Sequence, residues 1–525
     1  MKKFLKSNWI LLSILAIAAL FRFWQIGHLP GGLFPDEAAN GLDLNSILKG
    51  QIQPFFERGN GRESLFFYFL AIPVSLFGRG VWQHHIVSAA FGLASTLLTY
   101  FITKRCFSKN VALLATFFMA ISSFAVTISR TAFRANTVPL FATLTLLLLI
   151  KFFQETDNKK RLWLALFSGV SLGLNFYTYI SSRMLIPLIL FFGIILAYSQ
   201  RHRIKELIKQ YWKPKLAFAS GFVLSFAWIG IYFLKHPGTF GGRAGQVSIF
   251  SPDLNQGDVV GTFILVFKKT ILSFFTQGDL NWRHNVSGAP FLSPFLSPFF
   301  ALALVIFTAA IFKLVYDAHK RRVDEKTCYQ ALIAVWFWSM LAPELVTAEG
   351  IPHGLRLIGV IPSIFILSAY GIYLVWQKIS SFKYFYNSKV AFAAIILASL
   401  FLYNFYLYFA VAAYSPEYYY AFRSDLTEVS NYLNVRNDKS KTFLSLDAFS
   451  VQTVDYLTTE KGNPYILVVP ENTYQLKLAK NDQVVFTQST IFDVVKFLKF
   501  HPEAKLVKES KNKWDQTVML VYEQK

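Results

Sequence analysis

Long apolar stretches alternate with short charged ones along most of the 525-residue chain. A helix needs about 20 mostly apolar residues to cross the hydrocarbon core of a bilayer. The pattern predicts eleven such spans, near 8–26, 83–103, 111–129, 137–153, 162–178, 184–200, 216–234, 293–314, 330–347, 357–377 and 389–412. FRFW follows the first apolar run, where a signal peptide would carry small residues, so we expect an uncleaved helix there.

Two further apolar stretches, 64–78 and 259–275, leave open whether they cross the membrane. Cytoplasmic loops of membrane proteins are enriched in Lys and Arg, and every second connection between the eleven spans is rich in both. A crossing at 64–78 would turn all later basic loops outward. We therefore predict that both stretches are interfacial helices on the outer surface. We expect a multi-pass protein of the plasma (inner) membrane with a cytoplasmic N-terminus.

The pattern changes after residue 412. Short runs typical of strands, TFLSL, YILVV, QVVFT and TVMLVYE, alternate with the amphipathic pieces LTEVSNYLNV and TIFDVVKFLKF. The predicted fold class is a mostly α polytopic membrane bundle followed by a small α/β domain. The predicted organisation is a membrane module at 1–412, with outer loops 27–82 and 235–292, and an extracytoplasmic domain at 413–525.

The composition supports this organisation and gives no reason to expect a nucleic-acid partner. Hydrophobic residues make up 54% of the chain and charged residues 16%, which is typical of a polytopic membrane protein. The net charge of +22 lies in the membrane module, because residues 413–525 carry 14 basic and 14 acidic residues. Basic cytoplasmic loops explain this excess, so no nucleic-acid partner is expected.

Arginine and lysine are distributed unequally between the two predicted faces. The inner segments carry 18 Lys and 6 Arg, whereas the outer ones before the tail carry 4 Lys and, with Arg22 near the outer end of the first span, 10 Arg. Arginine offers a planar fork of donors that suits a phosphate. We expect Arg130, Arg134, Arg183 and Arg356 to bind an oxyanion; the alternative is that they pair with acids on the same loops.

The predicted outer loops also gather other polar side chains. An acidic pair, Asp36 and Glu37 in FPDEAANG, follows directly on the first span, and polar groups at span ends often mark a functional site. The further candidates for substrate binding are Glu57, Arg62, Glu63, Tyr177 and Tyr179. The two glutamates could instead pair with Arg58 and Arg62, and the two tyrosines could be packing residues. His353 could donate to phosphate, bind a metal or be an ordinary loop residue.

With this acidic pair in place, residues 1–412 resemble the polyprenyl-phosphate-dependent glycosyltransferases of the GT-C fold, the superfamily of the protein O-mannosyltransferases and the lipid A aminoarabinose transferase. FFERGNGRESLFFYF and GIPHGLRLIGVIP resemble a bacterial branch of that superfamily. The resemblance implies that Asp36 is the catalytic base, and Glu37 could orient it or bind acceptor.

The resemblance also implies partners. They are a polyprenyl-phosphate sugar donor held at the membrane lipid, and an acceptor hydroxyl on a protein, a lipid or a glycan. A phosphate leaves without protonation if cations hold its charge, so one base and several arginines suffice for an inverting transfer. Some members of the superfamily use a divalent metal ion and others do not, so no cofactor is assigned.

Two other functions fit a polytopic protein. A transporter or flippase would usually place ionisable residues near the membrane midplane, in broken helices. Here the predicted spans are mostly free of charge and the polar residues gather at one face. A nonenzymatic scaffold that displays the tail would give no reason for the outer arginines. The sequence therefore favours a membrane glycosyltransferase.

Overall fold

The computed structural model describes residues 2–380, 389–436 and 440–525, and the chain folds into two compact units. The first unit comprises Met1–Trp24, Gln53–Phe66 and Ser88–Val411. The second comprises Gln25–Ile52, Phe67–Val87 and Ala412–Lys525. The second unit thus joins parts of the predicted first outer loop to the C-terminal tail, although the two are far apart in sequence.

Seven described helical stretches are long and apolar enough to cross a membrane: Val81–Cys106, Arg134–Gln154, Ile180–Ser199, Trp212–Lys235, Ser297–His319, Ile358–Ile379 and Val390–Ala412. They contain α4 (Val81–Cys106), α7 (Thr137–Gln154), α9 (Leu185–Ser199), α11 (Trp212–Lys235), α15 (Ser297–His319), α17 (Ile361–Ile379) and α18 (Lys389–Tyr406). The prediction of a multi-pass membrane protein is confirmed.

The exact number of eleven spans is not confirmed. An eighth candidate is a bent pair, α5 (Lys109–Ile121) and α6 (Ser123–Arg130), with 58° between the two helices. The other three predicted spans coincide with helices α1 (Lys2–Phe23), α8 (Asn158–Asn175) and α16 (Glu325–Leu345), and their crossing of the membrane stays a prediction.

Polar side chains form hydrogen bonds with the backbone groups at the break between α5 and α6. Arg22 is fully buried and donates to the carbonyl oxygens of Met119 at 3.1 Å and Ala120 at 2.9 Å, which end α5. The Asn404 side chain accepts from the backbone N–H of Ser123 at 2.9 Å. Backbone groups freed inside an apolar bundle are costly unless they are hydrogen-bonded, so these side chains stabilise the bend.

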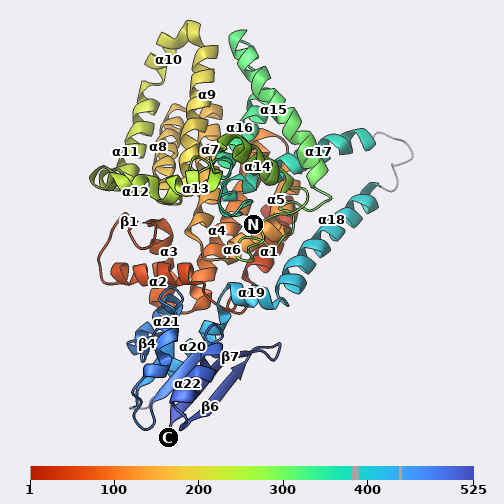
Figure 1. Cartoon of the computed structure of the whole chain (residues 1–525). Helices are drawn as coiled ribbons and strands as arrows, with labels where there is room; N and C mark the ends of the chain where they lie inside the picture. The colour runs from red at the N-terminus through yellow and green to blue at the C-terminus, as the bar shows by residue number, and fades with distance from the viewer. Residues whose placement is uncertain (1, 381–388, 437–439) are drawn as a thin grey trace. The chain divides into compact units, whose positions relative to one another are not determined.

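Close helix packing in the first unit depends on small residues. Helices α8 and α11 lie side by side (Figure 1). A Cβ on Gly169 would lie 2.0 Å from the carbonyl oxygen of Phe218, and one on Gly221 would lie 2.3 Å from that of Leu166. Glycines at such a contact let two backbones approach closely, as in other membrane helix pairs.

The two doubtful apolar stretches form short helices. α3 (Leu65–Phe77) has 13 residues and α14 (Val259–Leu272) has 14. At about 1.5 Å per residue each is roughly 20 Å long, whereas the hydrocarbon core is about 30 Å thick. Neither helix reaches across by itself. Their assignment to the outer surface stays a prediction.

A five-stranded sheet organises the C-terminal part of the second unit, in the order β4-β3-β5-β7-β6. Its strands are β3 (Thr442–Ser445), β4 (Ile466–Val468), β5 (Gln483–Thr487), β6 (Ala504–Lys511) and β7 (Thr517–Gln524). β3 pairs in parallel with β4 and β5, and β7 is antiparallel to β5 and β6. The four predicted strands are confirmed. β6 was missed because this edge strand, AKLVKESK, is mostly exposed and shows little apolar alternation.

Helices α20 (Ser424–Val435), α21 (Val451–Thr458) and α22 (Val494–Phe500) accompany this sheet (Figure 1). Leu426 and Val429 of α20 and Val454 of α21 share one buried cluster with Leu444 of β3 and Val485 of β5. The small C-terminal α/β fold is therefore confirmed. The remaining short elements are α10 (Ile204–Gln210), α12 (Pro237–Gly241), α13 (Pro252–Asn255), α19 (Pro416–Ala421), β1 (Phe55–Phe56) and β2 (Arg62–Glu63).

Helix α2 (Pro35–Leu48), which begins with the acidic pair, packs on α21 of the tail. Gly41 makes the approach close, because a Cβ there would lie 2.3 Å from Cε2 of Tyr456. Thr453 donates its hydroxyl to the carbonyl oxygen of Leu33 at 3.0 Å. The segment FPDEAANG is therefore held by the C-terminal part of the chain.

Candidate active site

The acidic pair occupies the first turn of α2, and its two carboxylates have different surroundings. Glu37 is fully buried: its Oε2 accepts from the backbone N–H of Phe34 at 2.9 Å, and its Oε1 lies 3.4 Å from Nε2 of His85. Carboxylates are favoured at a helix N-terminus, where backbone N–H groups lack intrahelical partners. Glu37 thus has a structural role at the start of α2.

Asp36 precedes Glu37 and is only partly buried. Pro35 at the first helical position has no N–H to satisfy and fixes the backbone for the helix start. The same turn therefore holds one carboxylate inward and leaves its neighbour more accessible. Of the two side chains, Asp36 is the more exposed.

A second polar cluster lies in the first unit around Glu63 of β2. Its Oε2 accepts from Nε of Arg134 at 2.9 Å, and its Oε1 lies 3.7 Å from Nη2 of Arg183. Arg134 also donates to the carbonyl oxygen of Gly61 at 3.2 Å. Glu63 is 5% exposed at its side chain, so a single buried carboxylate holds two of the predicted phosphate-binding arginines together.

The two tyrosines predicted near this cluster differ in role. The guanidinium of Arg134 lies 5.2 Å from the ring centroid of Tyr179, within the range of a cation–π contact. Burial raises the pKa of Tyr179, although Arg134 acts to lower it. The hydroxyl of Tyr177 instead accepts from the backbone N–H of Ile229 at 3.0 Å, and its ring belongs to an apolar cluster. Tyr177 is thus a packing residue.

Arg356 lies between two further acids. Its Nη1 donates to the carbonyl oxygen of Glu349 at 2.5 Å and lies 3.7 Å from Oε2 of Glu344. Its Nη2 lies 3.9 Å from a carboxylate oxygen of Glu349. Both carboxylate distances exceed a hydrogen bond, so these ion pairs are loose. The Arg356 side chain is 14% exposed, so it is sheltered yet reachable.

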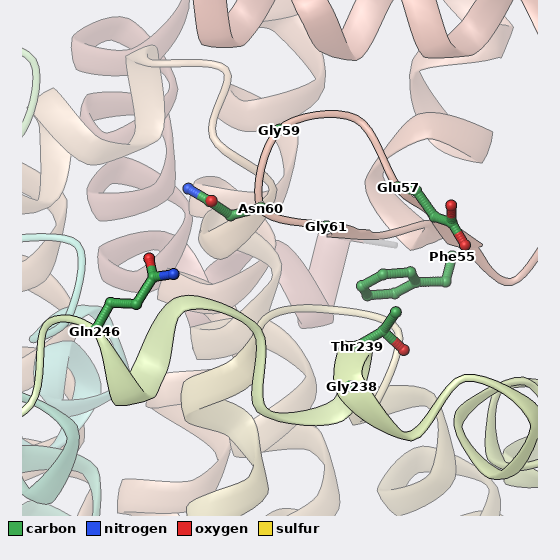
Figure 2. Close-up of a pocket in the computed structure, with 8 residues that line it drawn as sticks. All are labelled: Phe55, Glu57, Gly59, Asn60, Gly61, Gly238, Thr239 and Gln246. Carbon is green, nitrogen blue, oxygen red and sulfur yellow. The ribbon is translucent and has the colours of Figure 1, made fainter.

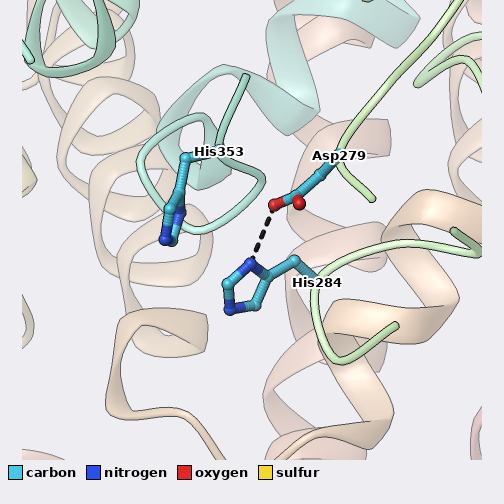
Figure 3. A group of neighbouring side chains, drawn as sticks. All are labelled: Asp279, His284 and His353. Atoms are coloured by element: carbon cyan, nitrogen blue, oxygen red, sulfur yellow. Dashed lines mark hydrogen bonds and ion pairs between the residues drawn. The ribbon is translucent and has the colours of Figure 1, made fainter. Parts of the chain in front are cut away.

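Three loop side chains come together in the first unit: Asp279, His284 and His353 (Figure 3). Nδ1 of His284 lies 2.8 Å from Oδ2 of Asp279, and the two imidazole centroids are 4.4 Å apart. Asp279 also accepts from the backbone N–H of Gly354 at 2.8 Å and from that of Asn281 at 2.8 Å. Sequence patterns indicated only His353 of these three. GDLNWRH carries the other two, but their spacing within one loop predicts no pairing by itself.

Arg130 lies elsewhere and is fully buried. It donates to the carbonyl oxygens of Phe21 at 3.0 Å and Trp24 at 2.7 Å, at the end of α1. A cation at a helix C-terminus is favourable, so this arginine caps α1. These contacts give Arg130 a structural role, and it is therefore left out of the phosphate site proposed below.

Glu57 and the GNG turn line a cavity of about 310 Å³ (Figure 2). The turn at Gly59, Asn60 and Gly61 faces Gly238, Thr239 and Gln246 across it. Glu57 accepts from the hydroxyl of Tyr232 at 2.5 Å and lies 4.0 Å from Nδ1 of His236. Arg62 is buried in β2 beside this turn. Of the two predicted glutamates, Glu57 is the one that faces the cavity.

Comparison with known proteins identifies the fold of the chain. Residues 64–231 match the family model for dolichyl-phosphate-mannose-protein mannosyltransferases. ArnT from Cupriavidus metallidurans bound to undecaprenyl phosphate has a similar structure, with a TM-score of 0.54, 12% identity and 98% of both chains covered. The chain has the GT-C fold. The predicted fold class and the resemblance stated from the sequence are thereby confirmed.

Two other matches extend this comparison. The putative mannosyltransferase YkcB of Bacillus subtilis is 32% identical over 127 residues, a match that spans 24% of this chain and only 17% of that protein. The archaeal oligosaccharyltransferase AglB from Archaeoglobus fulgidus, in complex with an inhibitory peptide and a dolichol-phosphate, gives a TM-score of 0.50 at 13% identity, over 99% of this chain and 75% of that one.

Proposed function

We propose that this protein is an inverting glycosyltransferase, which moves a sugar from a polyprenyl phosphate to an acceptor hydroxyl on the outer face of the membrane. The observation that carries the proposal is a GT-C fold whose first unit holds sheltered arginines next to loosely paired acids. The matched structures that were solved with undecaprenyl phosphate and with a dolichol-phosphate support the donor class. A transporter or flippase is not favoured by these matches.

Arg356 is the proposed main ligand of the donor phosphate. Its carboxylate partners lie at 3.7 and 3.9 Å, beyond hydrogen-bond distance, so an incoming phosphate need not break a strong pair. A guanidinium can bind phosphate with two parallel hydrogen bonds. Arg183 has a similar loose contact with Glu63 and is proposed to assist, whereas Arg134 is held more firmly by the same carboxylate.

Asp36 is the proposed catalytic base. The acceptor oxygen attacks the anomeric carbon while the bond between that carbon and the phosphate oxygen breaks. The acceptor proton passes to the Asp36 carboxylate, and the phosphate leaves with its negative charge, which the arginines stabilise. Attack from the face opposite the phosphate inverts the anomeric centre. Glu37, buried and bonded to the helix start, is a positioning residue for its neighbour.

The cavity beside Glu57 is proposed to take the sugar or the acceptor. A small ligand commonly occupies a site of a few hundred cubic ångströms with a few polar groups. Glu57, Asn60 and Gln246 supply such groups around about 310 Å³.

Exchange of the two carboxylates in separate variants tests the proposal. Asp36→Asn keeps shape and hydrogen bonding but cannot take the proton, so transfer should fall by about 10²- to 10⁴-fold. Binding of the polyprenyl-phosphate sugar should stay near the wild-type value, because the arginines provide it. Both are measured on detergent-solubilised protein, with sugar transfer to envelope acceptors read by mass spectrometry.

Glu37→Gln is the matched comparison. It keeps an oxygen that can accept from Phe34, so it should reduce transfer less than Asp36→Asn. Normal transfer in Asp36→Asn, or a severe loss in Glu37→Gln alone, would show that the base had been assigned to the wrong carboxylate.

A further inference from the structure

Asp279, His284 and His353 form the one group of three metal-ligand side chains found among the described residues. Each offers one ligand atom, and these atoms all lie within 4.8 Å of one another. They come from two loops: Asp279 and His284 lie between α14 and α15, and His353 lies between α16 and α17. Figure 3 shows the Asp279 carboxylate and the His284 ring pointing toward each other, with the His353 ring beside them.

One buried nitrogen of this group lacks a hydrogen-bond partner among the described residues. Nδ1 of His353 is buried and has no hydrogen-bond partner in the described part of the chain. A buried polar atom without a partner costs about 1–3 kcal/mol, so native structures rarely keep one without a reason. An ion held between the two loops would satisfy this nitrogen.

The carboxylate of Asp279 is fixed in place by its hydrogen bonds. Its Oδ2 accepts from the backbone N–H of Gly354 at 2.8 Å, and its Oδ1 accepts from the backbone N–H of Asn281 at 2.8 Å. The Asp279 carboxylate and both imidazoles are therefore held close together before any ion binds.

The donor set indicates which ions fit. Two imidazole nitrogens and one carboxylate oxygen are typical of zinc, whereas calcium and magnesium prefer oxygen ligands. Tetrahedral zinc with bonds of about 2.1 Å separates its ligand atoms by about 3.4 Å, so the group needs to contract slightly on binding.

The position of the group links it to Arg356. The backbone N–H of Arg356 donates to the carbonyl oxygen of His353 at 3.1 Å, so both belong to one turn. This turn lies close to the other loop, because a Cβ on Gly354 would lie 3.0 Å from Cβ of His284. An ion that joins His353 to His284 would therefore fix the turn that presents Arg356.

We propose that Asp279, His284 and His353 bind one divalent ion of the zinc type, and that the ion fixes the turn carrying Arg356. The ion is a positioning element, and the chemistry assigned to Asp36 and Arg356 does not pass through it. Only its effect on donor binding rests on the proposed function; the metal site itself does not.

Metal content is the first test. Full-length protein without a polyhistidine tag is purified in detergent from zinc-supplemented cells, dialysed and measured by elemental mass spectrometry. Wild type should retain about one zinc per chain, the stoichiometry of a single site of this kind. His353→Ala and Asp279→Asn should each weaken zinc binding by at least the roughly ten- to hundredfold that even an outer partner of a metal ligand contributes.

His202→Ala is the matched control, because His202 is exposed and distant in sequence from the three residues. It should keep the wild-type zinc content. Wild-type protein that retains no zinc, or His353→Ala and Asp279→Asn proteins that retain all of it, would overturn the proposal. In that case Asp279 and His284 are an ordinary hydrogen-bonded pair.

Zinc removal is the second test, with a readout independent of sugar transfer. A chelator should speed hydrogen exchange of the 279–284 and 353–356 peptides in wild type and change it little in His353→Ala. It should also weaken donor binding in wild type. Equal exchange with and without the chelator would refute the positioning role.

These outcomes separate the two proposals. If the purified protein contains no zinc but still transfers sugar, the metal site is refuted and the proposed glycosyltransferase function stands. If the protein binds zinc but neither binds nor uses any polyprenyl-phosphate sugar, the proposed function is refuted and the metal site stands.

Discussion

The contact between Gly41 and Tyr456 offers a direct test of how the tail holds the acidic pair. In Gly41→Ala the new Cβ would meet three ring atoms of Tyr456 at 2.3, 2.5 and 2.8 Å. Ordinary contact begins near 3.4 Å, so the ring and α2 must separate by roughly 1 Å. Tyr456 is fully buried, and its ring centroid lies 4.8 Å from that of His84, so it cannot simply swing away.

Two effects of the substitution oppose each other. Alanine inside a helix is favoured over glycine by up to about 1 kcal/mol. Overpacking of a buried contact typically costs about 1–3 kcal/mol, and a separation this short lies toward the upper end. We therefore expect Gly41→Ala to destabilise the packing of α2 on α21 by about 1–2 kcal/mol.

Hydrogen exchange measures this loss locally. A change of about one to two kcal/mol alters the open population about 5- to 30-fold, so amides in 35–48 and 451–458 should exchange faster by that factor. Transfer should fall too, because α2 carries Asp36. Gly193→Ala is the control, since Gly193 is also helical and no atom lies within 4 Å of its added Cβ.

A second substitution checks the cause. Tyr456→Leu removes the ring atoms that the new Cβ meets, so the double variant should be less impaired than the sum of the two single changes. Unchanged exchange in Gly41→Ala, or strictly additive effects in the double variant, would refute the reasoning from this contact.

Two other predictions concern the donor and the membrane orientation. Arg356→Lys keeps the charge but loses the planar fork, so donor binding should weaken about ten- to a hundredfold, as expected for a loss of roughly 1.5–3 kcal/mol. Arg203→Lys is the control: Arg203 forms an exposed ion pair with Glu206, so this variant should bind the donor normally. Equal donor affinity in the two variants would exclude Arg356 as the phosphate ligand. For orientation, Cys106 is buried and Cys328 partly so, which makes both poor reporters. Lys480→Cys should be labelled by an impermeant thiol reagent in intact cells and Lys205→Cys only after permeabilisation, and the reverse pattern would invert the topology.

Local pattern in the sequence was enough for several parts of this fold. Apolar length predicts membrane helices, because lipid offers backbone groups no partner outside the helix. Alternation predicted four strands of the tail, and it failed for β6, whose mostly exposed residues carry little apolar pattern. The acidic pair, the arginines of the predicted outer loops and His353 were likewise visible in the sequence.

Which of those residues meet depends on the tertiary structure. Glu63 contacts both Arg134 and Arg183, whereas Arg130 caps a helix. The spacing of these arginines in the sequence does not distinguish the two roles. Asp279 and His353 are far apart in the chain and meet only because two loops pack closely at Gly354. Contacts of this kind depend on which side chains share a buried space. Periodicity records only which face of each element is apolar, so it leaves such contacts undetermined.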